Sequence, residues 1–181
     1  FEDHLTLINA PFGDGNTRAV IAAVRQLRPD KPLTQAILTH HHVDYAGGVR
    51  AAVAEGLTLV VHKSSREYYE DIVGRTHGIN PDALATSPQA LQIETVGEEM
   101  TLEDATRRLE LYHVAGSEWV DGLLMAYLPA ERLLYEADVF SPPADPLTRR
   151  YPEYPYAANL VDNIEARGLE IERVVPAHGQ V

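Results

Sequence analysis

One short stretch, residues 39–48, constrains the fold of this chain more than any other part of it. It follows the apolar run 33–38, which predicts a buried strand, and it precedes a run with the apolar spacing of a helix. Within it His40, His42 and Asp44 alternate, so that in an extended loop the three side chains point the same way. Two imidazoles and a carboxylate in one strand-to-helix turn are typical of half a metal site.

Strands and helices are expected to alternate on both sides of this turn. Residues 5–9 predict a short strand, and Asn16 or Thr17 can cap a helix that runs to about residue 27. After the strand at 33–39 we expect a helix at about 46–55, a strand at 57–62 and a helix at 65–73. Short connections between alternating strands and helices predict a layered α/β domain.

The second half of the chain has a different pattern. The segment 75–89 has little periodicity and predicts a lid or a binding loop. The strands expected after it form an antiparallel meander, followed by a helix at 157–167 and a last strand at 171–175. The expected meander strands are 91–96, 100–102, 107–114, 122–128 and 132–137. The length of 181 residues and the uniform composition predict one domain over residues 1–181.

Composition excludes several classes of protein. Hydrophobic residues make up 45% and charged residues 23%, as in a soluble globular protein. The formal net charge of −12 argues against a nucleic-acid partner, and no apolar run approaches the roughly 18 residues that span a membrane. The chain has no cysteine, so a metal would have to be held by His, Asp or Glu.

The sequence constrains location and assembly less strongly. A chain without cysteine is compatible with the cytosol and the periplasm, and we expect a cytoplasmic protein. The chain begins at Phe1 with no initiator Met, which leaves a removed N-terminal signal open. A small-molecule substrate is the expected partner, and a homo-oligomer is compatible with the sequence.

Three further residues resemble the opening motif in their position. His113, Asp138 and His178 each stand at, or just past, the end of a predicted strand. Any one of them alone would more often be a strand-end cap or a half-exposed side chain than a ligand. Together with the alternating motif they predict a complete metal site.

The order of these residues resembles that of the metallo-β-lactamase-fold hydrolases. The similarity lies in H-x-H-x-D after Thr39, Gly47-Gly48 after the motif, a His before a Gly, an apolar strand that ends in Asp138, and a last His before Gly179. It covers most of the chain and implies a four-layer αββα sandwich. Only about forty residues precede the motif, so either the first sheet of that fold is incomplete in this chain or the sequence lacks the N-terminal part of the protein.

The resemblance also implies a ligand set and a reaction. His40, His42 and His113 would hold a first zinc ion, Asp44 and His178 a second metal, and Asp138 would bridge the two. A zinc-bound hydroxide would attack a small ester, lactone, thioester, β-lactam or phosphoester. Asp44 would orient that hydroxide and then carry its proton to the leaving group.

Tyr45 departs from the pattern of this family, which has a histidine after the Asp of the motif. A phenol is a poor zinc ligand at neutral pH, so the second site is expected to be weak or filled by Mn or Fe. His41 could replace the missing imidazole, but it should alternate away from His40 and His42. Tyr45 itself is a candidate catalytic residue that donates a proton or hydrogen bond to the leaving group.

Substrate contacts are the least constrained part of the prediction. Trp119, Arg149 and Tyr151 are the candidate substrate-binding residues, although for Trp119 core packing is the role we expect first. Two alternatives to a zinc hydrolase stay open. One is a non-catalytic metal- or ligand-binding module with a decayed second site, and the other is a di-iron redox protein on the same fold.

Overall fold

The computed structural model describes residues 1–141 and 155–178, which divide into two compact units, Phe1–Val96 and Gly97–Val181. Two of the predicted substrate contacts, Arg149 and Tyr151, lie outside the described residues. None of the helices in the described ranges combines the length and the apolar character needed to cross a bilayer.

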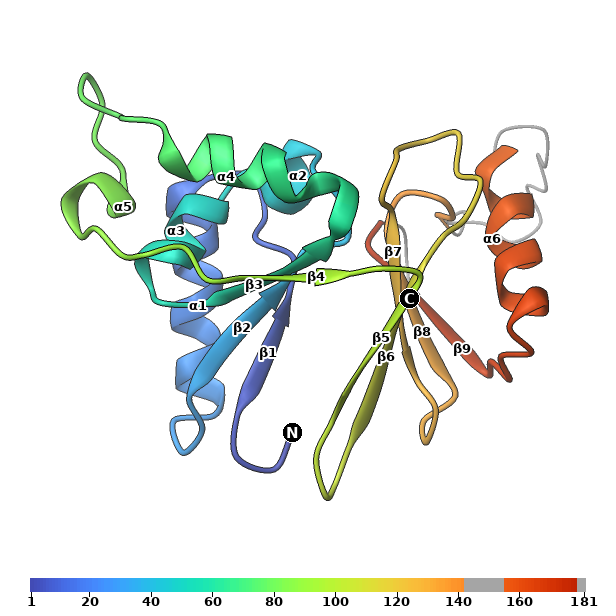
Figure 1. Cartoon of the computed structure of the whole chain (residues 1–181). Helices are drawn as coiled ribbons and strands as arrows, with labels where there is room; N and C mark the ends of the chain where they lie inside the picture. Colours follow the sequence, from blue (N-terminus) through green and yellow to red (C-terminus); the bar gives the residue numbers. More distant parts are fainter. Residues whose placement is uncertain (142–154, 179–181) are drawn as a thin grey trace. The chain divides into compact units, whose positions relative to one another are not determined.

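The first unit is built on a four-stranded parallel sheet with the order β1-β2-β3-β4 (Figure 1). Its strands are β1 (Leu5–Ile8), β2 (Leu33–Ile37), β3 (Thr58–His62) and β4 (Ile93–Val96). Its helices are α1 (Asp14–Leu27), α2 (Val43–Ala46), α3 (Val49–Ala54), α4 (Arg66–Gly74) and α5 (Ala83–Thr86), with a 3-10 turn at Lys63–Ser65.

The core of the first unit follows from the strand pleat. Leu59 and Val61 alternate along β3, so they point to one face of the sheet, where they are fully buried. That face packs against Ile21 of α1 and Ala52 of α3, in one apolar cluster. The helices of this unit are therefore held by the apolar stripe that the periodicity of the sequence predicts.

The pairing that the sequence predicted for the strand at 91–96 is wrong. We expected it to open the antiparallel meander, but β4 pairs parallel to β3, with Val60 opposite Glu94. The physical reason is the connection between them, in which α4 and α5 return the chain to the same end of the sheet. Such a helical crossover joins parallel strands, whereas a meander needs only short turns.

The second unit contains a five-stranded sheet with the order β5-β6-β7-β8-β9. Its strands are β5 (Glu99–Glu103), β6 (Arg108–His113), β7 (Leu124–Leu128), β8 (Leu133–Glu136) and β9 (Arg173–Pro176), and its helix is α6 (Pro155–Ala166). The first four strands form the expected antiparallel meander, and β9 pairs parallel to β8. Met125 and Tyr127, which alternate along β7, pack together with Leu134 of β8 and Leu160 of α6.

Candidate metal centre

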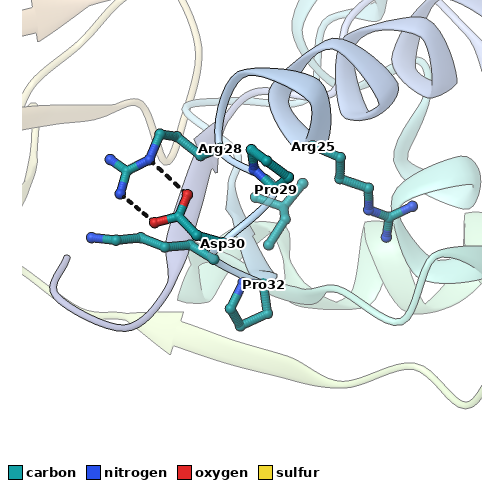
Figure 2. A pocket seen from close by; sticks show the side chains of 7 residues that line it. Arg25, Arg28, Pro29, Asp30 and Pro32 are labelled. Carbon is teal, nitrogen blue, oxygen red and sulfur yellow. Dashed lines mark hydrogen bonds and ion pairs between the residues drawn. The ribbon is translucent and has the colours of Figure 1, made fainter.

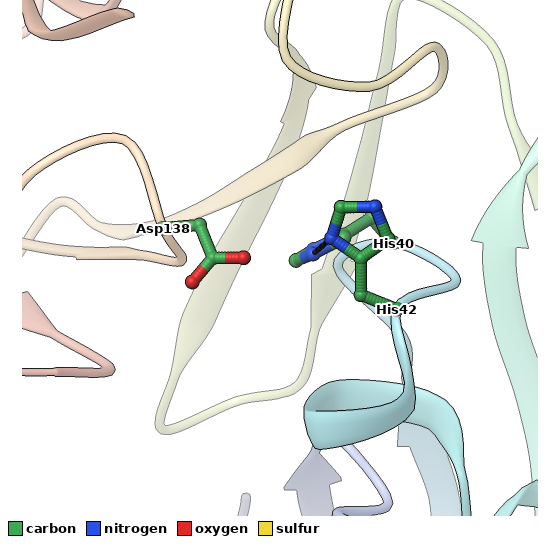
Figure 3. Close-up of side chains that lie close together, drawn as sticks. All are labelled: His40, His42 and Asp138. Atoms are coloured by element: carbon green, nitrogen blue, oxygen red, sulfur yellow. Dashed lines mark hydrogen bonds between the residues drawn. The ribbon is translucent and has the colours of Figure 1, made fainter. Parts of the chain in front are cut away.

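The loop after β2 places two histidines of the motif side by side. Leu38 and Thr39 are buried, and His40 is only 1% exposed, whereas His42 is half-buried and forms the N-cap of α2. Nε2 of His40 lies 3.1 Å from Nδ1 of His42, and Figure 3 shows the two rings together. Two nitrogen ligands of one tetrahedral zinc are about 3.3 Å apart, from zinc–nitrogen bonds of about 2.0–2.1 Å. The imidazole pair therefore has the spacing that a shared zinc requires.

A buried hydrogen-bond chain sets the tautomer of His40. Oδ1 of Asn9 accepts from both the backbone N–H and the hydroxyl of Thr39, each at 3.0 Å. The only hydroxyl proton of Thr39 is thus used, so its oxygen accepts from Nδ1–H of His40 at 3.2 Å. With the proton on Nδ1, the lone pair of His40 is on Nε2, the nitrogen that faces His42. That is the state in which a neutral imidazole binds a metal.

Two glycines allow the turn to pack closely against the segment after β1. A Cβ at Gly47 would lie 2.3 Å from the carbonyl oxygen of Phe12, and one at Gly48 would lie 2.0 Å from Oγ1 of Thr17. The same close approach is held by backbone hydrogen bonds from Phe12 N to Val43 O and from Gly48 N to Ala10 O. The Gly47-Gly48 pair therefore allows the histidine loop to pack closely here, and any side chain at either position would push the loop away.

Tyrosines of α4 hold the backbone of the histidine loop from a second side. Tyr69 is fully buried and its hydroxyl donates to the carbonyl of His40 at 3.1 Å, while burial raises the pKa of the Tyr69 phenol. The ring of Tyr68 lies 5.0 Å from that of His41. His41 thus packs on α4, while His40 and His42 face each other.

The other two residues of the motif lie on α2. Asp44 is in the first turn of this helix and is half-buried. Tyr45 is only 3% exposed, and its ring centroid lies 4.5 Å from that of His40. The tyrosine that replaces the expected histidine is therefore packed against the first ligand candidate.

In the second unit, Asp138 and His178 approach each other at the ends of neighbouring strands. Asp138 follows β8 and His178 follows β9, and because these strands are parallel their carboxyl ends meet at one edge of the sheet. Nε2 of His178 lies 3.4 Å from Oδ1 of Asp138. The Asp138 carboxylate is also drawn in Figure 3. Both residues are candidate metal ligands by type and position.

His113 has different surroundings. It is the last residue of β6, and its Nδ1 lies 3.3 Å from Oε2 of Glu98. Its carbonyl accepts from Arg167, the residue after α6, at 2.8 Å. Across residues 1–141 and 155–178, no group of candidate ligands includes His113. The structure thus brings Asp138 and His178 together and pairs His113 with a carboxylate.

Trp119 lies beside the site and outside the apolar core of its unit. It is 38% exposed, and its indole Nε1–H donates to Oδ2 of Asp138 at 3.3 Å. Its ring centroid lies 5.2 Å from that of Tyr156 on α6. The expectation that Trp119 packs in the core is therefore wrong, because the side chain lies at the surface of its unit.

Glu136 is a residue of this site that the sequence reasoning missed. It is 1% exposed, and its Oε2 accepts from the backbone N–H groups of Val139 and Phe140, each at 3.2 Å. Burial raises the pKa of its carboxyl to about 7, against the lowering effect of those two hydrogen bonds. A glutamate in the same alternation as buried Leu134 was the available signal, because an acidic side chain on the apolar face of a strand is rare.

A surface hollow in the first unit lies away from the histidine loop. The hollow, whose lining side chains are drawn in Figure 2, has a volume of about 510 Å³ and adjoins the start of β2. His40 follows the opposite end of that strand. Its arginines are already paired, Arg25 with Glu55 at 2.6 Å and Arg28 with Asp30 at 2.8 Å. The hollow is therefore no competitor to the histidine loop as a reactive site.

Comparisons with known proteins match the chain to a family and to solved structures of similar fold. The model of the metallo-beta-lactamase superfamily matches residues 11–178. Solved structures with a similar fold include a metallo-beta-lactamase from Pontibacter korlensis, with TM-score 0.67 and 18% identity over 98% of this chain and 76% of that one. The enzyme FIM-1 from Pseudomonas aeruginosa, in a mono-zinc form, gives TM-score 0.67 and 17% identity over 99% of this chain and 74% of that one. A metallo-beta-lactamase from Hirschia baltica gives TM-score 0.65 and 17% identity over 98% of this chain and 75% of that one.

Proposed function

Because the chain belongs to the metallo-beta-lactamase superfamily, we propose that it is a zinc-dependent hydrolase of a small ester, lactone, thioester, β-lactam or phosphoester. Membership of this superfamily supports a metal-dependent hydrolase, and the fold is that of the similar solved enzymes. The observation that carries the proposal is the His40–His42 pair, with ring nitrogens 3.1 Å apart and the tautomer of His40 set by Thr39.

The proposed ligands come from both units of the chain. His40 and His42 would hold a first zinc, Asp44 and His178 a second metal, and Asp138 would bridge them. His113 is proposed as the third imidazole of the first site, with the Glu98 carboxylate on Nδ1 leaving Nε2 for the metal. FIM-1, which has a similar fold, has been solved in a mono-zinc form, so occupation of one site alone has a precedent on this fold.

The chemistry needs both the metal and residues of this chain. Zinc, when bound, lowers the pKa of a water molecule to near neutrality and polarises the bond to be cleaved. Asp44 would accept a proton from the attacking water and pass it to the leaving group. Tyr45 is proposed to give the leaving group a hydrogen bond from its phenol, which lies against His40.

The test begins with metal content. Zinc bound per chain is measured by elemental analysis for the parent, His42→Ala and His4→Ala, a control in the same unit whose ring bonds to Asp3 at 2.8 Å. We expect the parent and the control to bind zinc and His42→Ala to lose it, because one of the two paired imidazoles is gone.

Activity is then measured on a panel of esters, lactones, thioesters, β-lactams and phosphoesters, with and without chelator. We expect turnover that the chelator removes and that zinc restores. Zinc bound without turnover of any member would instead support the non-catalytic binding module. A His42→Ala variant that binds zinc as well as the parent would overturn the proposed ligands.

A further inference from the structure

The two oxygens of Asp138 have different neighbours within the second unit. Oδ2 accepts from the indole N–H of Trp119 at 3.3 Å, while Oδ1 faces Nε2 of His178 at 3.4 Å. A carboxylate that is free to rotate about its last bond presents its two oxygens interchangeably. Here the indole N–H of Trp119 lies on Oδ2 and distinguishes it from Oδ1.

The position of the indole is set by contacts other than Asp138. Oγ of Ser117 accepts from the backbone N–H groups of Trp119 and Val120, at 3.3 and 3.5 Å. Val120 is buried in the apolar cluster under α6, and Tyr156 of α6 lies against the indole ring. The donor is therefore fixed in place from its backbone and from its ring face.

The backbone of Asp138 is held by its own set of contacts. Asp138 has a φ of 70°, and the two residues after it donate their N–H groups to the buried Glu136. A left-handed backbone conformation is uncommon at residues other than glycine, although aspartate adopts it more readily than most, and here the two hydrogen bonds to Glu136 hold the turn. With the backbone fixed, the remaining freedom of Asp138 is the rotation of its side chain.

We propose that Trp119 is a positioning residue for the metal. Its indole N–H holds Oδ2 of Asp138, so that Oδ1 alone is presented beside His178 as a single-oxygen ligand. The inference rests on the proposed function, in which Asp138 is a metal ligand. Hydrogen bonds to ligating carboxylates fix their orientation, and their loss typically weakens metal binding about 10–100-fold.

The first test compares zinc affinity in Trp119→Phe with that of the parent. Phenylalanine keeps an aromatic ring for Tyr156 and lacks the N–H donor. Tyr127→Phe is the matched control, since it also removes one aromatic donor of this unit, the hydroxyl that bonds to the carbonyl of Glu170 at 2.8 Å. We expect Trp119→Phe to bind zinc about tenfold more weakly, with its metal-free melting temperature unchanged, and Tyr127→Phe to retain the parent affinity.

The second test needs no change at Trp119. The chain has one tryptophan, so a proton–nitrogen NMR spectrum contains one indole N–H signal. We expect this signal to move upfield in Asp138→Ala, where the acceptor is lost, and to shift when zinc is added to the parent. An indole N–H signal whose chemical shift is the same in Asp138→Ala and in the zinc-loaded parent as in the metal-free parent would overturn the proposal.

The outcomes separate this inference from the function on which it rests. A parent that binds no zinc overturns the proposed function and this inference with it. A parent that binds zinc, together with a Trp119→Phe variant of equal affinity, overturns the positioning role alone. Equal losses in Trp119→Phe and Tyr127→Phe would also overturn it, because the effect would then be a general loss of stability in the unit.

Discussion

At the scale of single residues, the hydroxyl of Thr39 has only one possible arrangement of its hydrogen bonds. Its hydroxyl has one proton, and Asn9 can only accept it through Oδ1, which leaves the hydroxyl oxygen to accept from His40. Asn9 is itself 4% exposed with a φ of 69°, an uncommon conformation that asparagine tolerates better than most residues. The direction of this chain of hydrogen bonds follows from the donor inventory alone.

Replacing Thr39 should therefore weaken metal binding. We expect Thr39→Val to lower zinc affinity about tenfold, because Nδ1–H of His40 loses its acceptor and the ring is no longer held. The buried donor left without a partner should cost about 1–3 kcal/mol in the free energy of unfolding. Zinc competition and urea denaturation measure the two effects. Thr39→Ser keeps the hydroxyl and should resemble the parent, and unchanged zinc affinity in Thr39→Val would show that the hydrogen-bond chain has no role.

At the scale of elements, one buried arginine ties three helices of the first unit together. Arg50 of α3 is 7% exposed and makes two hydrogen bonds to Asp82, of 2.5 and 3.1 Å. Its Nη1 donates to the carbonyls of Ile72, Val73 and Arg75, at 3.1, 2.7 and 2.8 Å, where α4 ends. Asp82 in turn caps α5 by accepting from Ala85 N at 2.9 Å. The segment predicted to be a lid or binding loop is thus anchored to α3 at its middle.

Removing the Arg50–Asp82 pair should lower the free energy of unfolding, by an amount that depends on pH. We expect Asp82→Asn to lower the free energy of unfolding by about 3 kcal/mol at pH 7, because Arg50 stays buried without a charged partner. The Arg50 guanidinium lowers the pKa of Asp82 to about 2. A carboxyl whose pKa is lowered in the folded state stabilises the protein above its unfolded pKa of about 4 and loses that effect as the pH falls toward 2. The difference between parent and variant should therefore shrink between about pH 4 and pH 2.

Asp30 provides a matched control for this measurement. Its pKa is also lowered to about 2 by an arginine, Arg28, but both side chains are exposed. Exposed pairs contribute little to stability, so Asp30→Asn should leave the urea midpoint unchanged at pH 7. Equal effects of the two substitutions would contradict a special role for the buried anchor.

The same scale shows what the sequence could and could not predict. The strands and helices on either side of the histidine turn were predicted close to their observed positions, because their apolar periodicity is local information. The partner strand of β4 was predicted wrongly, because the four residues of this strand carry no signal that distinguishes a parallel neighbour from an antiparallel one. Among the site residues, the alternation of His40 and His42 was visible in the sequence, but the extended loop expected to reach Asp44 ends at His42, because Asp44 lies in α2. The orientation of His113 toward Glu98 depends on the pairing of β5 with β6 and was not visible in the sequence.

At the scale of the whole molecule, the proposed ligands lie in two compact units that join between Val96 and Gly97. A ligand that binds only the folded protein stabilises it, by about 2.7 kcal/mol when its concentration is 100 times its Kd. For a chain of 181 residues this corresponds to a rise of about 5–10 °C in the melting temperature. If residues of both units hold the same metal, substitutions in either unit should remove this rise.

We therefore expect zinc to raise the melting temperature of the parent, and neither His42→Ala nor Asp138→Ala to respond. The two substitutions lie in different units, so a common loss argues for one shared centre, whereas two independent sites would leave part of the rise in each variant. Calorimetry with and without zinc measures the shift, and His4→Ala should retain it in full. A full zinc response in Asp138→Ala would remove this carboxylate from the ligand set and, with it, the bridging role proposed for it.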